Sequence, residues 1–539
     1  MHLQFVDYAV VAVYGISLLI LAQWVSREKK GHQKNTQDYF LAGRALPWWA
    51  IGASLIAANI SAEQIIGMSG SAYVMGVAIA SYEWMAALTL IIVGKYLLPV
   101  FLKHKIYTMP QFLEQRFDHR VRMVMATFWL GVYVFVNLTS ILWLGSLAIN
   151  AITGLDQVWG LVILGLFAIS YSLYGGLKAV ALTDIIQVVL LVFGGLIIAY
   201  IAMDRLGGGE GVIAGFMYTM EQAPEKFDMI FTKDSPYYEY LPGISVLVGG
   251  MWIMNLSYWG FNQYIIQRAL AAKSPQEAQK GIAFAAFLKM LMPVLVVLPG
   301  IAVALVVPDL DPPDRAYPTA MALLPVGLKG LVFAALVAAI VSSLASMTNS
   351  ISTIFTMDMY KHFKPEDTDQ KHLVMVGRSV AFTAMIIAMI VAKPLLGGFD
   401  QAFQYIQEFT GFFTPGIVAI FLLGFFYKKT TANGALGAAI GSFVLSLLFK
   451  WLWPELPFID RVGLVFILCT VLGMVISLME KKGDHPDAIA YGEIDTKTTA
   501  GFNWASLVII LMLAFLYTCL LYTSDAADDR YKVEMGVGG

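Results

Sequence analysis

The sequence predicts an all-α polytopic membrane protein with about 14 transmembrane helices. Only 13% of its 539 residues are charged, whereas soluble domains have about 25%. Hydrophobic residues make up 58% of the chain, and the mean hydropathy is +0.71. Apolar runs of about 20 residues, the length that crosses a bilayer as a helix, recur along the whole chain.

The spans follow these apolar runs in order. They are predicted at residues 5–25, 47–76, 78–102, 122–152, 157–174, 179–203, 243–267, 281–307, 328–358, 375–395, 400–427, 432–452, 461–480 and 502–522. The first run has no basic region before it, so we expect a retained helix and not a signal peptide.

Lysine and arginine predict the orientation of the chain. The loops between spans alternate from one side of the membrane to the other. Every second loop, starting with the first (Arg27, Lys29 and Lys30), is basic, whereas the acidic "PDLDPPDR" (308–315) lies in a loop of the opposite side. Positive loops stay in the cytoplasm, so both termini are predicted on the non-cytoplasmic side of a plasma (inner) membrane. The long outer connection 204–240 is predicted to form a small surface lid.

Two spans carry polar residues at their centres. One contains "LIAANISAEQIIGMSGS" (55–71) and the other "MNLSYWGFNQ" (254–263). Asn, Ser and Gly at mid-span suit a locally unwound helix, which is tolerated where it lines a cavity. The two run in opposite directions, as in an inverted repeat with binding at the midplane. Packed polar interfaces between helices are the alternative interpretation.

A helix rich in small residues, 334–350, allows two interpretations. Its alanines and serines suit close helix packing. The adjacent hydroxyls of Ser342 and Ser343, together with backbone carbonyls, also offer the oxygen ligands that hard cations such as Na⁺ prefer.

Enzymatic chemistry is not indicated. All seven histidines lie at ends of spans or in polar connections, and both cysteines, Cys469 and Cys519, lie in apolar runs. No catalytic or phosphate-binding motif is present. We therefore expect a protein that is not an enzyme, has no organic cofactor and binds no nucleic acid.

Three groups of motifs resemble a known family. "GGLKAVALTDIIQ" (175–187) is similar to the signature of the sodium/solute symporter family, with a Gly-Gly turn before its Thr-Asp pair. "YWGFNQYIIQRALAAKS" (258–274) resembles its sodium–sugar branch. "ISAEQIIGMSGSAY", "SYEWMAALTLIIVGKYLLP" and "QAFQYIQEFTG" are similar to its bacterial sodium/galactose (glucose) members. The resemblance covers the chain to about residue 522.

The resemblance implies a core of five plus five helices in an inverted repeat. The implied organisation is an N-terminal extra helix and loop (1–46), a first repeat (47–203), an outer loop (204–242), a second repeat (243–427), three C-terminal helices (428–522) and a polar tail (523–539). We expect the tail to be disordered or foreign to the core.

The resemblance also implies the sites. Sodium would be the coupling ion, bound by the carbonyls of Ala57, Ile60 and Ala339 and the hydroxyls of Ser342 and Ser343. Asp184 would assist sodium release, or be a structural helix-end charge. The implied sugar-binding residues are Gln64, Glu83, Asn255, Lys289, Gln407 and Tyr258. Of these, Tyr258 would also be the inner gate. The implied outer gates are Met68, Tyr82 and Phe403. Glu63, one residue from the sugar face, is expected to hold the neighbouring helix.

Two positions depart from the pattern of sugar-transporting members. Ser257 precedes Tyr258 where a second aromatic residue is usual, and Ala86 stands where some bacterial members have a serine. Both departures concern which solute binds.

The function expected is sodium-coupled symport of a neutral, galactose- or glucose-like hexose into the cell by alternating access. The alternatives are another solute, such as sialic acid, inositol or proline, and a membrane sensor or channel on the same scaffold. A monomer or weak homo-oligomer in the lipid bilayer is expected.

Overall fold

The computed structural model describes residues 3–25, 41–364, 369–397 and 402–534. Within these ranges the chain is helical, with no strand beyond an isolated bridge between Leu46 and Ala272. Nine helices there are long and apolar enough to cross a membrane, or ten if one bent pair is counted as a span. The all-helical membrane class is therefore confirmed.

The helices of the first half begin with α1 and end with α11. They are α1 (Phe5–Val25), α3 (Trp48–Asn59), α4 (Met68–Met75), α5 (Ser81–Ile92), α6 (Leu98–Lys103), α7 (Met109–Arg116), α8 (His119–Val132), α9 (Thr139–Thr153), α10 (Gln157–Leu206) and α11 (Val212–Gln222). Short π-helical turns continue several of them, including η2 (Glu63–Gly67) and η5 (Tyr133–Leu138).

The second half runs from α12 to α24. Its helices are α12 (Ser245–Val248), α13 (Gly250–Leu256), α14 (Gln263–Leu270), α15 (Pro275–Met292), α16 (Leu298–Val306), α17 (Ala316–Met321), α18 (Leu328–Ile354), α19 (Gln370–Leu396), α20 (Ala402–Gly411), α21 (Thr414–Phe426), α22 (Ala432–Leu452), α23 (Phe458–Met479) and α24 (Ala500–Glu534).

Both predicted broken helices are confirmed. The first breaks after α3, where Ile60 has φ −70° and ψ 73° before the chain resumes in η2. The second breaks at Asn262, which has an extended backbone between the π-helical turn η7 (Ser257–Phe261) and α14. Unwound backbone inside a membrane protein frees amides and carbonyls to line a cavity.

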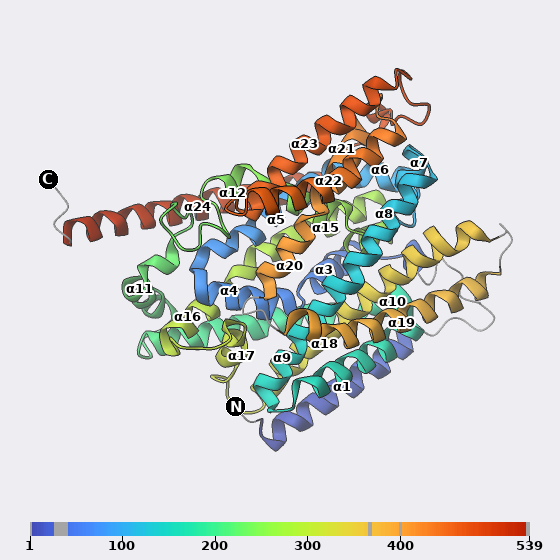
Figure 1. Ribbon diagram of the computed structural model, residues 1–539. Coiled ribbons are helices and arrows are strands. Elements are labelled where there is room, and N and C mark those ends of the chain that lie inside the picture. Colours follow the sequence, from blue (N-terminus) through green and yellow to red (C-terminus); the bar gives the residue numbers. More distant parts are fainter. Residues whose placement is uncertain (1–2, 26–40, 365–368, 398–401, 535–539) are drawn as a thin grey trace.

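The first broken helix lies at the centre of the bundle. α3 packs against α10, α15 and α18, and α18 also packs against α1, α10 and α19. Figure 1 shows α1, α10, α18 and α19 along one side of the molecule and α21, α22 and α23 on the other. The break is therefore enclosed by helices from distant parts of the sequence.

Two expectations about the elements are wrong. Residues 157–206 form one helix, α10, in place of two spans with a Gly-Gly turn between them. Glycine inside a helix costs only about 1 kcal/mol, and helix-forming residues flank Gly175 and Gly176. The tail is also not disordered throughout, because α24 continues to Glu534. No Pro or Gly interrupts residues 502–534, so nothing in the local sequence ends the helix earlier.

The connection after α10 has structure of its own and reaches back to α4. Lys226 donates hydrogen bonds to the carbonyl oxygens of Tyr73 (3.0 Å) and Val74 (2.7 Å), which lie in the last turn of α4. Burial lowers the pKa of Lys226, although nearby Glu225 raises it. Gly76 follows with φ +74°, and a Cβ there would overlap the backbone carbonyl of Lys226.

We therefore expect Gly76→Ala to destabilise the protein by more than about 1 kcal/mol, because alanine is strained at positive φ and the connection would have to move. The unfolding temperature of the purified variant in detergent measures this. Gly15→Ala is the control: it lies within α1, has nothing within 4 Å of a new Cβ and should unfold close to the wild-type temperature. Equal unfolding temperatures for both variants would contradict the expectation.

Candidate functional site

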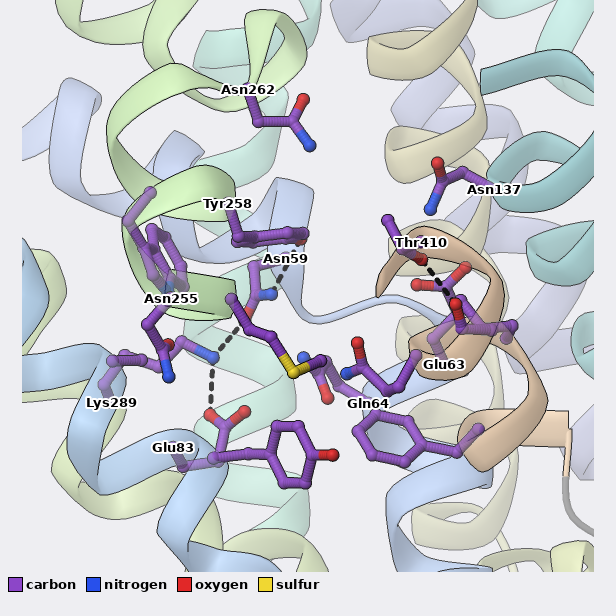
Figure 2. A pocket seen from close by; sticks show the side chains of 17 residues that line it. Asn59, Glu63, Gln64, Glu83, Asn137, Asn255, Tyr258, Asn262, Lys289 and Thr410 are labelled. Carbon is purple, nitrogen blue, oxygen red and sulfur yellow. Dashed lines mark hydrogen bonds and ion pairs between the residues drawn. The ribbon is translucent and has the colours of Figure 1, made fainter. Parts of the chain in front are cut away.

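A polar pocket lies beside the break in the first helix. It contains about 640 Å³ of empty space, part of it open to solvent. Side chains from η2, α5, α15, α20, α13, η7 and the second break itself line it. Figure 2 shows these side chains pointing toward a common space. Most of the predicted solute-binding and gate residues line this pocket: Gln64, Tyr82, Glu83, Asn255, Tyr258, Lys289, Phe403 and Gln407.

An ion pair forms one wall of the pocket. The Lys289 ammonium on α15 lies 2.5 Å from the Glu83 carboxylate on α5, and both residues are fully buried. Lys289 also donates to the Asn59 side-chain oxygen and lies 5.0 Å from the centre of the Trp259 ring. Because α5 and α15 pack together, the two charges are desolvated and compensate each other.

Asn59 connects this ion pair to the predicted inner gate. Its amide nitrogen donates to the Tyr258 hydroxyl at 2.9 Å, and Tyr258 is hydrogen-bonded in turn to the Tyr264 hydroxyl. Asn59 is the last residue of α3 and Tyr258 lies in η7. One amide thus joins the two broken helices across the pocket.

Two of the three predicted outer gates meet at the pocket. The rings of Tyr82 and Phe403 pack edge to face, with centroids 5.4 Å apart. A Cβ on Gly67 would lie 3.0 Å from the Phe403 Cβ, so α20 approaches η2 closely. Met68 is buried on α4 but is not among the lining residues.

The remaining predicted solute-binding residues are amides. Gln64 Oε1 is buried without a hydrogen-bond partner among the described residues. The Asn255 amide nitrogen donates to the Met251 carbonyl at 3.1 Å, which leaves its side-chain oxygen for a ligand. Gln407 lines the pocket from α20.

The predicted sodium residues lie where α18 crosses the first break. Ser343 donates to the Ala58 carbonyl at 3.1 Å and lies 3.4 Å from that of Ala57. Ala339, one turn earlier on α18, is fully buried, and Ile60 lies in the break itself. The geometry brings the Ser343 hydroxyl of α18 together with two carbonyls near the end of α3, and oxygen ligands of this kind suit a hard cation such as Na⁺.

Ser342, the other predicted sodium-binding hydroxyl, contacts Asp184. It donates to one Asp184 oxygen, and Ser54 donates to the other at 2.6 Å. The Arg268 guanidinium lies 3.8 Å from Asp184 and donates to Ser54 at 2.7 Å. All four are fully buried, so Asp184 belongs to a polar cluster behind the predicted sodium residues.

The expectation for Glu63 is incomplete. Glu63 lines the pocket together with Asn137 on η5 and Thr410 on α20, and these last two were not predicted at all. Asn137 and Thr410 are polar residues at the middle of apolar spans, the same signal that singled out Asn59. Figure 2 shows all three on the side of the pocket opposite Lys289.

A membrane-spanning bundle with two broken helices around a central polar pocket is the architecture of a secondary transporter. Residues 39–441 match the profile of the Sodium:solute symporter family. The chain belongs to this family, whose members are transporters and not enzymes, and it is a sodium-coupled solute symporter of the membrane.

Similar proteins include bacterial and mammalian transporters. A sodium/glucose cotransporter of Vibrio parahaemolyticus is 52% identical over 96% of this chain and 98% of its own length. A sodium/myo-inositol cotransporter 2 of Mus musculus is 33% identical over 82% of this chain and 69% of its own. The solved structure of a Na⁺-coupled sialic acid symporter has the same fold, with a TM-score of 0.77, 24% identity, and coverage of 88% of this chain and 98% of its own.

Proposed function

We propose that the protein couples the entry of Na⁺ to the uptake of a neutral, galactose- or glucose-like hexose by alternating access. The observation that carries this proposal is the pocket beside the helix break, where the Lys289–Glu83 ion pair shares the lining with uncharged amides and with Glu63. The Vibrio relative, 52% identical, is named as a sodium/glucose cotransporter.

The pocket residues match the chemistry of a sugar. Each hydroxyl of a pyranose both donates and accepts hydrogen bonds, and amides, a carboxylate and an ammonium serve both roles. We assign Gln64, Glu83, Asn255, Lys289 and Gln407 to these hydroxyls. Tyr258 would close the inner side of the site, and Tyr82, Phe403 and Met68 the outer side.

Sodium would bind Ala57, Ile60, Ala339, Ser342 and Ser343, and Asp184 would receive it on release. A membrane potential of 100 mV supplies about 2.3 kcal/mol per charge, and a tenfold sodium gradient adds about 1.4 kcal/mol. One ion could therefore support roughly 500-fold accumulation of sugar. Coupling requires only that both ligands prefer the same conformation.

The proposal includes the arrangement in the membrane. We assign an inverted-repeat core within 47–203 and 243–427 in the plasma (inner) membrane, and a monomer or weak homo-oligomer. The two breaks support it, because they lie in spans predicted to run in opposite directions.

Uptake by purified protein in proteoliposomes tests the function. With an inward sodium gradient we expect labelled galactose or glucose to accumulate at least tenfold over vesicles with an inward potassium gradient. Unlabelled hexoses should compete. No stimulation by sodium for either sugar would contradict the proposed function.

Inositol is a second candidate solute. It is also a neutral ring of hydroxyls, and the mouse relative is named as a sodium/myo-inositol cotransporter. If myo-inositol competes in the same assay at concentrations where galactose and glucose do not, inositol would replace the hexose as the proposed solute.

A further inference from the structure

An apolar groove lies between α24 and two helices of the bundle, α3 and α15. It contains about 940 Å³ of empty space, part of it open to the outside of the protein. Phe284 and Phe287 of α15, Ala505 and Ile509 of α24, and Trp48 of α3 are among its lining residues. Residues three or four positions apart share one face of a helix, so each of the two long walls is an apolar stripe.

The long walls of the groove belong to membrane-spanning helices. Pro275–Val306 and Ala500–Leu520 are both long and apolar enough to cross a membrane, and only 11% of the most apolar window of the second is buried. Figure 1 shows α24 at the edge of the bundle. Trp504 and Val508, which line the groove, are 68% and 48% exposed. Because the bilayer core holds no water, an apolar groove at this depth is filled by lipid chains.

α24 contacts the rest of the protein on both sides of the groove. Just before the helix, the Lys497 carbonyl accepts a hydrogen bond from the Gln279 side chain of α15 at 3.4 Å. Further along, the Tyr517 ring packs on the Trp84 ring of α5, with centroids 5.4 Å apart. Between these contacts the groove follows residues 501–509, roughly 12 Å of helix. This length is close to the hydrocarbon depth of one leaflet, about 15 Å.

The groove also carries a positive charge beside tryptophan. Lys280, the only charged residue among its described lining residues, lies in the second turn of α15, and its side chain is 45% exposed. Its ammonium is 3.8 Å from one oxygen of Glu277, whose other oxygen accepts the backbone N–H of Trp48 at 2.8 Å. So long and exposed a contact is weak, which leaves the ammonium available to another anion. Tryptophan is enriched at the level of lipid headgroups.

We propose that this groove is a binding site for an anionic phospholipid, with one acyl chain between α15 and α24 and the phosphate at Lys280. Basic pockets between membrane helices bind the headgroups of anionic lipids. The bound chain joins α24 to α3, which ends at the first break, and to α15, which carries Lys289. The inference concerns the lipid and is independent of the solute.

Thermal unfolding of the purified protein in detergent tests the site. Phosphatidylglycerol and phosphatidylcholine with the same acyl chains are added at equal concentrations, and glycerol phosphate represents the headgroup alone. In wild type we expect phosphatidylglycerol to raise the unfolding temperature at least about 3 °C more than phosphatidylcholine, because a ligand stabilises the state that binds it. Glycerol phosphate should have no effect. In Lys280→Gln the difference between the two lipids should fall below about 1 °C.

Two further variants separate the charge from the groove. Lys371→Gln is the matched control, because Lys371 is also an exposed lysine near the start of a membrane helix, α19, but does not line the groove. It should keep the full preference for phosphatidylglycerol. Ala505→Phe places a ring in the groove that Ala505 lines, so it should reduce the effect of phosphatidylglycerol at least as much as Lys280→Gln does.

Several results would overturn the proposal. Equal stabilisation of wild type by both lipids would do so, as would a Lys280→Gln variant that keeps the wild-type preference. Stabilisation by glycerol phosphate alone would assign Lys280 to a soluble anion. If Ala505→Phe left the lipid effect unchanged but dissociated a dimer in size-exclusion chromatography, the groove would hold a second copy of the chain. None of these measurements involves the transported solute, so the lipid site and the proposed function can fail separately.

Discussion

Lys289→Ala is expected to abolish sodium-driven hexose uptake, by more than about 100-fold, and to destabilise the protein by about 3–5 kcal/mol. Removing one partner of a buried ion pair leaves the other charge uncompensated, which costs this much in proteins generally. Here the uncompensated charge would be the Glu83 carboxylate, which is buried on α5 and lies 2.5 Å from the Lys289 ammonium. Uptake into proteoliposomes and the unfolding temperature in detergent measure the two effects.

A neutral double variant separates stability from transport. Glu83→Gln combined with Lys289→Gln removes both charges and should recover most of the stability, since buried pairs are often replaceable by neutral groups. It should not recover uptake, because the charge-assisted bonds to the solute, roughly twice as strong as neutral ones, are gone.

The ion pair of Lys280 and Glu277, in which the lysine is exposed, is the control for Lys289→Ala. Their charged groups are 3.8 Å apart, and the Lys280 side chain is 45% exposed. Lys280→Ala should therefore cost less than about 1 kcal/mol. A Lys289→Ala variant as stable as Lys280→Ala would contradict the expectation.

Ser343→Ala is expected to raise the sodium concentration for half-maximal uptake at least tenfold while leaving a folded protein in the membrane. Ser343 is the α18 side chain that reaches the Ala57 and Ala58 carbonyls at the break. The change removes one ligand oxygen from the proposed site, whereas its cost to folding is about one hydrogen bond, near 1 kcal/mol. Initial uptake rates across a sodium series measure the effect.

Thr348→Val controls for the loss of a buried hydroxyl on the same helix. Among the residues that the structure describes, Thr348 donates only within α18, to the carbonyls of Leu344 (2.8 Å) and Ala345 (3.0 Å), so its removal should leave sodium dependence unchanged. Normal sodium dependence of Ser343→Ala would contradict the assignment of Ser343 to the proposed sodium site.

The fold class followed from the sequence because bilayer physics is restrictive. Apolar runs near 20 residues have few structures available other than membrane helices, and Asn59 and Ser61 at mid-span marked the first break. The long helix α10 could not be predicted, because Gly175 and Gly176 weaken a helix without ending it. Local sequence likewise gave no sign of how far α24 extends.

The site was predictable only in part. Lys289 and Glu83 are 206 positions apart, and no sequence periodicity indicates that they are in contact. The family resemblance placed both residues at one site. Glu63 was placed off the pocket because α-helical spacing puts adjacent residues on different faces. Residues 63–67 instead form a π-helical turn, whose wider winding changes the spacing of side chains. Both Glu63 and Gln64 therefore line the pocket.

The hydrogen bonds of Asn59 have a direction. An ammonium can only donate, so Lys289 fixes the amide oxygen toward itself and the amide nitrogen toward Tyr258. Tyr258 accepts that bond and is free to donate its own proton to Tyr264. All three bonds then point the same way, and each polarises the next. The positive charge on Lys289 thus strengthens the hydrogen bond from Asn59 to Tyr258. A solute that accepts a hydrogen bond from the Lys289 ammonium would weaken this bond.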